Sequence, residues 1–381
     1  MDKYVYWLDN VPGLGDRSKI RLLAAFHSCE EVYLAKERYL HYILEEEQVN
    51  KLFCGKRSWD VDENWEKLSV SQIQMTAIHD EKYPLKLAKI PDPPFCLYYR
   101  GKLPDEELPS IAIIGARQCS EYGRYIAGEL GKSLGEHRIQ VISGMATGID
   151  GISQSAAMQA GGASFGVLGC GVDVCYPKSN QKLYEELVRG GGILSAYPPG
   201  TQPLKQLFPP RNRIVSGLSD VLVVIEARQK SGTSITVEMA LEQGKDIYAV
   251  PGRVTDRLSD GCNKMLREGA HVFLSPEDFL LELKQLLPEK MELAERMTKV
   301  QWSEETLFGN AEKGNEELSR EDKILAVLDF YPQYIEVIAL RLEKEQGLKL
   351  SMAELNGTLI QMCLWDEVKQ EGAGWFLKTG L

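Results

Sequence analysis

Seven short runs of hydrophobic residues alternate with stretches of helical pattern in the middle of the chain. Near-continuous apolar strands separated by helices are typical of a mostly parallel sheet that is covered on both faces. The pattern therefore predicts an α/β, Rossmann-like, doubly wound domain over residues 105–285, with strands at 111–115, 140–143, 163–168, 192–195, 221–225, 246–250 and 271–274.

The first seventy residues show a helical pattern that opens with a tight glycine turn. Val11-Pro-Gly-Leu-Gly15 is followed by hydrophobic positions at Ile20, Leu23, Ala24 and Phe26. This pattern predicts a helix-hairpin-helix, SAM-like domain over 1–70. In such a hairpin the backbone N–H groups of the turn can meet a DNA phosphate. A plain helical hairpin that packs on its neighbour is the alternative.

Three further segments complete the expected organisation. Proline density over 71–104 predicts an extended connector that ends in a short strand at 95–99. Acidic pairs within 286–318 predict a charged linker. Three helical patterns and two short strands about Gly372-Ala373-Gly374 predict a winged-helix domain over 319–381.

Composition narrows the class of protein. With 381 residues, 44% of them hydrophobic and 26% charged, the chain reads as a soluble globular protein of two or three domains. No apolar run is long enough to cross a membrane, and the N-terminus has no signal-peptide pattern, so we expect no membrane contact and a cytoplasmic location.

The 8 cysteines form no C-x-x-C pair, which fits a reducing compartment. The 5 histidines stand apart from the glycine-rich turns, which weighs against zinc and Ser-His-Asp chemistry.

The formal net charge of −11 argues against a general nucleic-acid coat. A negative net charge is compatible with a local basic groove, because nucleic-acid binding depends on the electrostatic field at the binding surface.

Ligands of open parallel sheets bind outside the carboxyl ends of the strands, so the residues after each strand are the candidates for a site. Glycines there let backbone N–H groups approach an anion, and helix N-termini add a favourable dipole. Together with the cations they predict a site for a phosphate-bearing ligand. The candidates, in chain order, are Gly115 and Arg117; Ser143, Gly144 and Thr147; Gly169, Gly171, Tyr176 and Lys178; Arg211, Asn212 and Arg213; and Lys230, Ser231, Gly232 and Thr233.

Two of these segments carry more specific expectations. Pro209-Pro210 predicts a stiff loop that presents Arg211 and Arg213 in a defined direction. After the strand at 221–225, Ser231 or Thr233 is expected to cap a helix while Lys230 supplies charge.

Standard nucleotide motifs are missing. The first strand is followed by Gly115-Ala-Arg-Gln-Cys-Ser120, which puts an arginine where a dinucleotide fingerprint needs its second glycine. No G-x-x-x-x-G-K-[ST] loop occurs. We therefore expect no nucleotide cofactor of a standard type.

At this point the residues resemble the DprA/Smf family of DNA-processing proteins across nearly the whole chain. The matching motifs are Gly115-x-Arg117, Ser143-Gly144 through Gly148-Ile-Asp150, Leu168-Gly-Cys-Gly-x-Asp173 with Tyr176-Pro177, Tyr197-Pro-Pro-Gly200, Phe208-Pro-x-Arg-Asn-Arg-Ile214, Ala240-Leu-Glu-Gln-Gly244, Ala249-Val-Pro-Gly252, Gly261-Cys-Asn263 and Gly269-Ala270.

The resemblance implies an extended Rossmann domain that binds single-stranded DNA, forms a homodimer and helps to load the RecA recombinase in natural transformation and recombination. It implies no enzyme activity and no cofactor. The family's DNA contacts carry over to Arg117, Lys178, Arg211, Arg213 and Lys230, with the glycine turns shaping the groove. Such binding should weaken with salt.

The chain departs from the family pattern in places. Ala116 stands where a serine is common, and Thr233-Ser234 stand where many relatives have small or apolar residues. Tyr176, Tyr197 and Phe208 are candidates for stacking on bases, with core packing as the alternative for Phe208. The DNA-binding roles of the terminal modules stay open.

Two other classes of function are weaker. A nucleotide phosphoribohydrolase would use Gly232-Thr233 and Glu238, but its Pro-Gly-Gly-x-Gly-Thr-x-x-Glu run is absent. A scaffold that bridges other proteins would explain the negative net charge of the chain. It would give no function to the cations Arg117, Lys178 and Lys230 at the strand ends.

Overall fold

The computed structural model describes residues 2–308, 319–329, 332–365, 367–372 and 374–377, without the side chains of 299–308, 371, 376 and 377. The chain divides into two compact units. The first comprises 1–118 with 127–299, and the second comprises 119–126 with 300–381.

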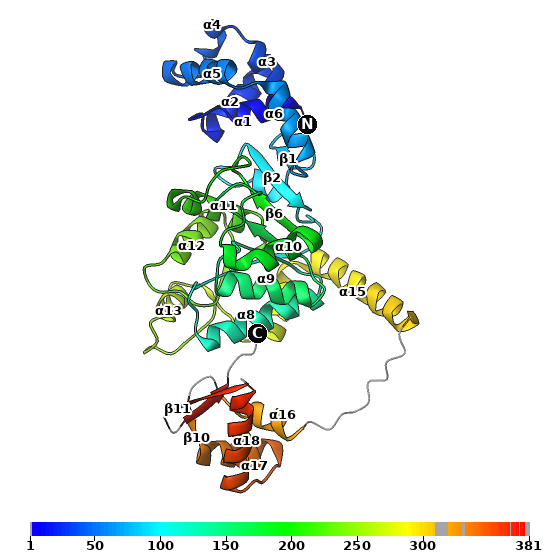
Figure 1. Ribbon diagram of the computed structural model, residues 1–381, viewed down its shortest axis with the longest axis vertical. Coiled ribbons are helices and arrows are strands. Elements are labelled where there is room, and N and C mark those ends of the chain that lie inside the picture. The colour runs from blue at the N-terminus through cyan, green and yellow to red at the C-terminus, as the bar shows by residue number, and fades with distance from the viewer. Residues whose placement is uncertain (1, 309–318, 330–331, 366, 373, 378–381) are drawn as a thin grey trace. The chain divides into compact units, whose positions relative to one another are not determined.

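A nine-stranded sheet organises the first unit (Figure 1). The seven strands predicted from the sequence are all present, and each pairs in parallel with its neighbours among them. The Rossmann-like α/β fold is therefore confirmed. In spatial order the strands are β1 (Gln74–Ala77), β2 (Cys96–Gly101), β6 (Gly192–Ser195), β5 (Ser164–Val167), β4 (Gln140–Ser143), β3 (Ser110–Ile114), β7 (Val221–Val224), β8 (Asp246–Ala249) and β9 (His271–Val272).

Two of these strands lie in the segment that the sequence presented as an extended connector. β1 pairs antiparallel with β2, and β2 pairs antiparallel with β6, so 71–104 extends the sheet rather than leading up to it. The strand predicted at 95–99 is β2, whereas β1 was not predicted; the prolines between the two strands give the segment the pattern of a connector.

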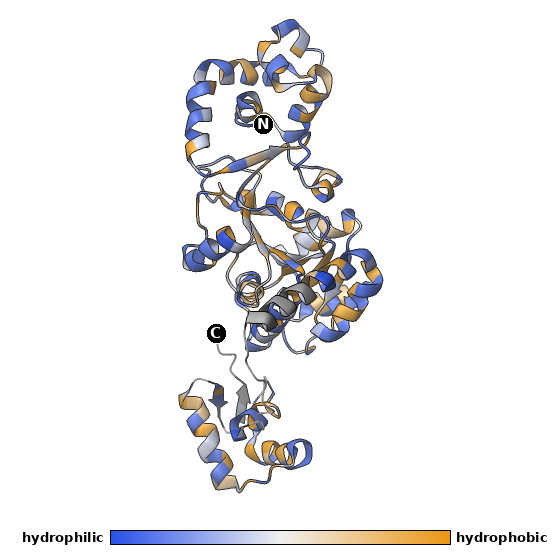
Figure 2. Cartoon of the chain, turned by 90° about the vertical axis from the view of Figure 1, so that its right-hand side faces the viewer, coloured by the Kyte–Doolittle hydropathy of each residue, from blue (hydrophilic) through white to orange (hydrophobic). Residues whose placement is uncertain are grey.

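Hydrophobic residues on both faces of the sheet explain the near-continuous apolar strands. Tyr98 belongs to one buried cluster, whereas its neighbours Leu97 and Tyr99 belong to another. Helices α9 and α10 contact the sheet at β4, β5 and β6, and α11 and α12 pack together and contact β5, β7 and β8. Most helices alternate hydrophilic and hydrophobic residues along their length, as expected when one side of a helix is buried (Figure 2). The helices that lie wholly or mostly in this unit, after the N-terminal ones, are α7 (Leu85–Ala88), α8 (Glu121–Glu136), α9 (Ile149–Gln159), α10 (Gln181–Gly190), α11 (Phe208–Gly217), α12 (Gly232–Glu242), α13 (Asp260–Arg267), α14 (Pro276–Leu286) and α15 (Pro288–Phe308), with short 3₁₀ turns at Lys178–Asn180 and Lys205–Leu207.

Six helices form the N-terminal part of the first unit. The predicted glycine turn joins the first two of them, and Gly13 in that turn has φ +74°, a conformation that glycine adopts readily. The hairpin is tied to the sheet because the Tyr98 hydroxyl donates to Asp9 Oδ2 at 2.6 Å. The helices are α1 (Lys3–Asp9), α2 (Asp16–Phe26), α3 (Cys29–Leu34), α4 (Glu37–Leu40), α5 (Glu46–Ser58) and α6 (Val61–Val70).

Much of the segment predicted as a charged linker is helical. Residues 288–308 form α15, and residues 309–318 lie outside the described residues. A run of charged residues occurs both in solvent-exposed helices and in extended linkers. The charge pattern alone therefore did not predict this helix.

The second unit contains the three helices and the terminal hairpin predicted for 319–381, with one further short strand. Its strands form an antiparallel sheet of order β10-β12-β11, and its buried cluster includes Ile338, Leu342, Leu355, Leu359 and Trp375. Ala373 of the predicted turn lies outside the described residues. The elements are α16 (Arg320–Leu325), β10 (Gln333–Tyr334), α17 (Ile335–Gln346), α18 (Met352–Leu364), β11 (Val368–Glu371) and β12 (Gly374–Leu377).

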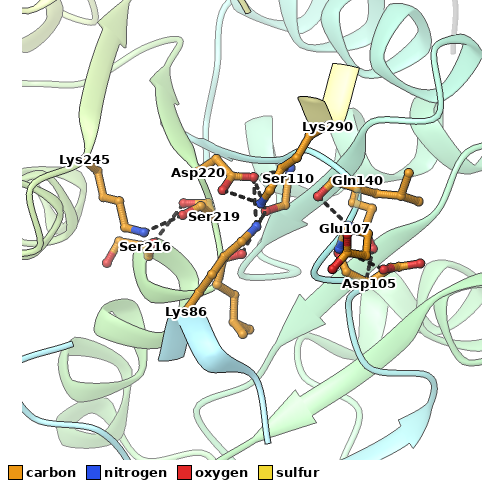
Figure 3. Close-up of polar contacts among 12 residues, drawn as sticks. Lys86, Asp105, Glu107, Ser110, Gln140, Ser216, Ser219, Asp220, Lys245 and Lys290 are labelled. Carbon is orange, nitrogen blue, oxygen red and sulfur yellow. Dashed lines mark hydrogen bonds and ion pairs between the residues drawn. The ribbon is translucent and has the colours of Figure 1, made fainter. Parts of the chain in front are cut away.

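A buried carboxylate stabilises the edge of the sheet where β3 and β7 begin (Figure 3). Asp220 accepts hydrogen bonds from Lys86 Nζ at 2.8 Å and Lys290 Nζ at 2.9 Å, and also from the backbone and side chain of Ser110. Burial alone would raise the pKa of Asp220, but the two ammonium groups bring it below its ordinary value. Burial lowers the pKa of Lys86 to about 8, although Asp220 favours its charged form. This cluster fastens α7 and α15 to the sheet at the edge opposite the predicted site.

Candidate nucleic-acid interface

The turns at the carboxyl ends of β3 and β4 pack tightly against each other. Gly148 precedes α9 with φ +76° and ψ −135°, and a Cβ there would lie 2.3 Å from the carbonyl oxygen of Ala116. A Cβ on Gly115 would lie 2.7 Å from Ile149. These glycines therefore fix the position of the turn that carries Arg117.

A buried arginine and a buried aspartate lie beneath these turns. Arg211 is 5% exposed, and its Nη1 donates to the carbonyl oxygens of Gly144, at 2.8 Å, and Val167. Asp150 is also buried, and its Oδ2 accepts from the backbone N–H of Gly144. Burial raises the pKa of Asp150, while the Arg211 guanidinium opposes that shift. The pair joins the ends of β4 and β5 and the start of α9.

An aromatic ring lies above the buried pair. The guanidinium carbons of Arg117 and Arg211 lie 5.8 and 5.9 Å from the centroid of the Phe208 ring, and the Tyr176 ring centroid is 5.5 Å from it. Gly169 makes room for the ring, because a Cβ there would lie 2.9 Å from Phe208. Phe208 is only partly buried, so core packing does not account for it fully.

Two cations at this place lack ion-pair partners among the described residues, namely Arg117 and Lys178. Both are exposed, and Lys178 follows the 39% exposed Tyr176 by two residues. We call Arg117, Tyr176, Lys178 and Phe208 the Phe208 surface.

The structure corrects the expectation of a stiff loop at the double proline. Phe208–Gly217 is helix α11, with proline at its first positions. Proline is favoured in the first turn of a helix, where its missing N–H leaves no bond unmade. The helical turn directs the two arginines to different places.

Arg213 is held in ion pairs. Its Nη2 lies 3.0 Å from Asp16 Oδ2, and its Nη1 contacts Asp92. Arg17 also pairs with Asp92, at 3.0 Å. Arg213 therefore connects α11 to the N-terminal hairpin, and its charge is already balanced.

The remaining candidate residues differ in burial and in their hydrogen bonds. Ser143 is buried and its hydroxyl donates to the Ile113 carbonyl oxygen, while Thr147 is exposed. The N–H of Gly171 donates to Thr201, and Asn212 accepts from Arg211 Nε.

The loop before α12 stands apart from the Phe208 surface. Lys230 and Gly232 are exposed, and Ser231 is the N-cap residue of α12 but makes no capping hydrogen bond. Within the described part of the chain, no hydrogen bond, ion pair or ring contact joins Lys230, Ser231, Gly232 or Thr233 to the Phe208 surface.

No group of three or more His, Cys, Asp and Glu side chains is placed to hold a metal ion among the described residues. In the same residues no helix is both long enough and apolar enough to cross a membrane.

Comparison with known proteins identifies the family. The family model for DNA recombination-mediator protein A matches residues 74–284, which covers the nine-stranded sheet. The chain belongs to the DprA/Smf family. DNA processing protein DprA of Streptococcus pneumoniae is 39% identical over 229 residues, which make up 60% of this chain and 81% of that protein.

Solved structures of family members agree in fold. The crystal structure of DprA from Streptococcus pneumoniae is similar with a TM-score of 0.67 and 34% identity, covering 74% of this chain and 98% of that one. DprA from Helicobacter pylori, studied for its single-stranded DNA binding mode, is similar with a TM-score of 0.51 and 30% identity, covering 57% of this chain and 98% of that one.

Proposed function

We propose that the chain binds single-stranded DNA at the Phe208 surface. The observation that carries this proposal is a partly buried aromatic ring with Arg117 and Tyr176 around it and with Lys178 two residues after Tyr176. Neither Arg117 nor Lys178 has an ion-pair partner among the described residues. Aromatic rings stack on unpaired bases of any sequence, and unpaired cations neutralise phosphates. In a duplex the base faces are already stacked on one another, so a duplex would use only the cations.

Arg211 and Arg213 then have a different role from the one their sequence suggested. Arg211 holds the strand ends on which the Phe208 surface is built, and Arg213 holds the N-terminal hairpin. We propose that the phosphates meet Arg117 and Lys178, with Lys230 reached only by a strand that extends past β7.

We further propose that DNA binding serves to load the RecA recombinase in DNA uptake, natural transformation and recombination, in the cytoplasm. The family membership supports this role. RecA loading is tested by the rate at which RecA begins ATP hydrolysis on a strand coated with single-strand-binding protein. We expect the chain to shorten the delay; an unchanged delay would contradict the role.

A homodimer through the Rossmann-like domain is also proposed. β9 is an edge strand of the sheet, and Leu274, just after it, is 69% exposed. Val272 on β9 and Leu281 on α14 are 45% and 59% exposed. Exposed hydrophobic residues beside an open sheet edge are typical of an interface.

Fluorescence anisotropy with a labelled single strand and the matching blunt duplex tests the DNA-binding proposal. We expect the single strand to bind at least about tenfold more tightly at physiological salt, because stacking on one base contributes about 1–3 kcal/mol. Equal affinity for the two forms would contradict binding at the Phe208 surface.

A further inference from the structure

A cavity of about 450 Å³ lies where the N-terminal hairpin meets α11. Its walls come from the hairpin turn and the start of α2, from the turn after β6, and from α11. Arg211 lines this cavity and also lies 5.9 Å from the Phe208 ring. Tyr197 lines it as well, and its hydroxyl donates to the carbonyl oxygen of Leu207, beside Phe208. The cavity is therefore adjacent to the Phe208 surface.

The charges around the cavity make it a poor phosphate site. Lys19 Nζ lies 2.8 Å from Asp9 Oδ1, and Arg213 is paired with Asp16. The third cation, Arg211, is opposed by the buried Asp150. With each cation already opposed by a carboxylate, and with Asp9 and Asp16 in the wall, an anion would gain little here.

The cavity suits a flat, uncharged ring. Val11, Leu14, Pro198 and Pro210 provide apolar walls, and Tyr197 adds an aromatic one. Flat heterocycles pack well against proline and tyrosine, and a ring of this kind loses unfavourable contact with water when it enters.

Two polar groups at the cavity can recognise the edge of such a ring. Nε of Arg213 is a buried donor without a hydrogen-bond partner among the described residues. Asp16, whose carboxylate pairs with the same arginine, is an acceptor, and its burial raises its pKa. A buried donor without a partner is costly, so a ligand that supplies an acceptor there and a donor for Asp16 would bind favourably.

We propose that this cavity takes one unstacked nucleobase of the bound strand and prefers a base with an exocyclic amino group over thymine. The amino group of adenine, cytosine or guanine donates to Asp16, and the neighbouring ring or carbonyl acceptor receives the N–H of Arg213. Thymine can donate its ring N–H to Asp16 and accept from Arg213 with one carbonyl oxygen, but its second carbonyl oxygen then lies beside the carboxylate without a donor. The inference rests on the proposed binding of single-stranded DNA.

The first measurement uses the full chain and a strand of about 16 thymidines. One thymidine is replaced in turn along the strand by deoxycytidine, and the affinity is measured by competition. At one position we expect cytosine to bind at least about fivefold more tightly than thymine. Tight binding of the thymidine strand with no gain at any position would overturn the base site and leave the proposed function standing. Failure of every strand to bind would contradict the proposed function itself.

The second measurement locates the site. Leu14 is 4% exposed and lines the cavity, whereas Leu34 is 69% exposed in the same helical part of the chain and does not line it. We expect Leu14→Phe to abolish the gain from cytosine while leaving the thymidine strand bound within about twofold, and Leu34→Phe to change neither. Thermal unfolding checks each variant. Should Leu14→Phe fail to fold, Pro198→Phe, at a partly exposed wall residue, replaces it. A folded wall variant that keeps the gain would overturn the assignment.

Discussion

Burial decides what each arginine of this site can do. Arg211 and Arg117 both approach the Phe208 ring, but the first is buried among carbonyl oxygens and the second is exposed. A guanidinium that already satisfies buried carbonyls has little left to offer a phosphate, and removing it would leave Asp150 buried without its counter-charge. The exposed arginine makes no such contribution to the fold, so it is available to bind the ligand.

Asp220 provides a stability prediction, because its side chain and those of Lys86 and Lys290 are 11%, 13% and 25% exposed. We expect Asp220→Asn to lower the free energy of unfolding by about 3 kcal/mol at neutral pH, since it leaves two lysines without their carboxylate. The pKa of Asp220 is lowered in the folded chain, so its contribution is present above the ordinary value of 3.8 and lost as the pH falls through the lower folded value.

Urea unfolding as a function of pH measures this contribution. The difference between the wild type and Asp220→Asn should be constant near neutral pH and shrink below pH 3.8. Asp62 is the matched control, because it pairs with Lys3 at 2.6 Å but its side chain is 80% exposed. Equal effects of Asp220→Asn and Asp62→Asn would show that burial of the cluster does not matter.

The turns between strands and helices depend on close backbone approach, and Gly148 is where this can be tested. An alanine there must accept a backbone conformation that only glycine adopts readily, and its Cβ would lie 2.3 and 2.6 Å from the carbonyl oxygens of Ala116 and Arg117. We expect Gly148→Ala to displace the turn that carries Arg117 and to lower single-strand affinity roughly tenfold, or about 1.4 kcal/mol.

Gly161 separates this effect from backbone strain. It also has a positive φ, of +79°, but nothing lies within 4 Å of the Cβ it would gain. Gly161→Ala should therefore cost some stability without changing DNA affinity. Loss of affinity in both variants, to the same extent, would mean that general destabilisation rather than the position of Arg117 is responsible.

Hydrophobic patterning predicted most of the central fold, because its strands are buried on both faces and cannot tolerate polar residues. Of the two antiparallel strands, β2 matches the strand predicted at 95–99, and β1 was missed because the proline-rich stretch between them has the pattern of a connector. Helix α11 was missed because a double proline suits a loop as well as a first helical turn.

The candidate site was predicted less completely than the fold. Its position at the strand ends followed from topology, as did the choice of Arg117 and Lys178. The pairing of Arg213 with Asp16 and Asp92 joins residues 197 and 121 positions apart, and nothing local in the sequence signals such a contact. The buried place of Arg211 likewise depends on the final packing of β4, β5 and α11.

Assembly of the whole molecule is predicted to use the β9 edge. We expect Leu274→Glu to weaken self-association at least about tenfold in sedimentation equilibrium, because it places a charge in an apolar contact. Leu34→Glu is the matched control, since Leu34 is equally exposed, at 69%, and lies in the N-terminal helical part. A Leu274→Glu variant that associates like the wild type would contradict an interface at this edge.

The central claim is that phosphates of a single strand meet Arg117 and Lys178, and a salt titration of binding tests it most directly. The logarithm of the binding constant falls linearly with the logarithm of the salt concentration, with a slope of about −0.7 for each phosphate contact on a single strand. The double variant Arg117→Ala with Lys178→Ala should bind more weakly and show a slope smaller in magnitude by about 1.4, whereas Arg189→Ala, at an exposed position on α10, should keep the wild-type slope. A wild-type slope in the double variant would show that these two residues do not contact the strand.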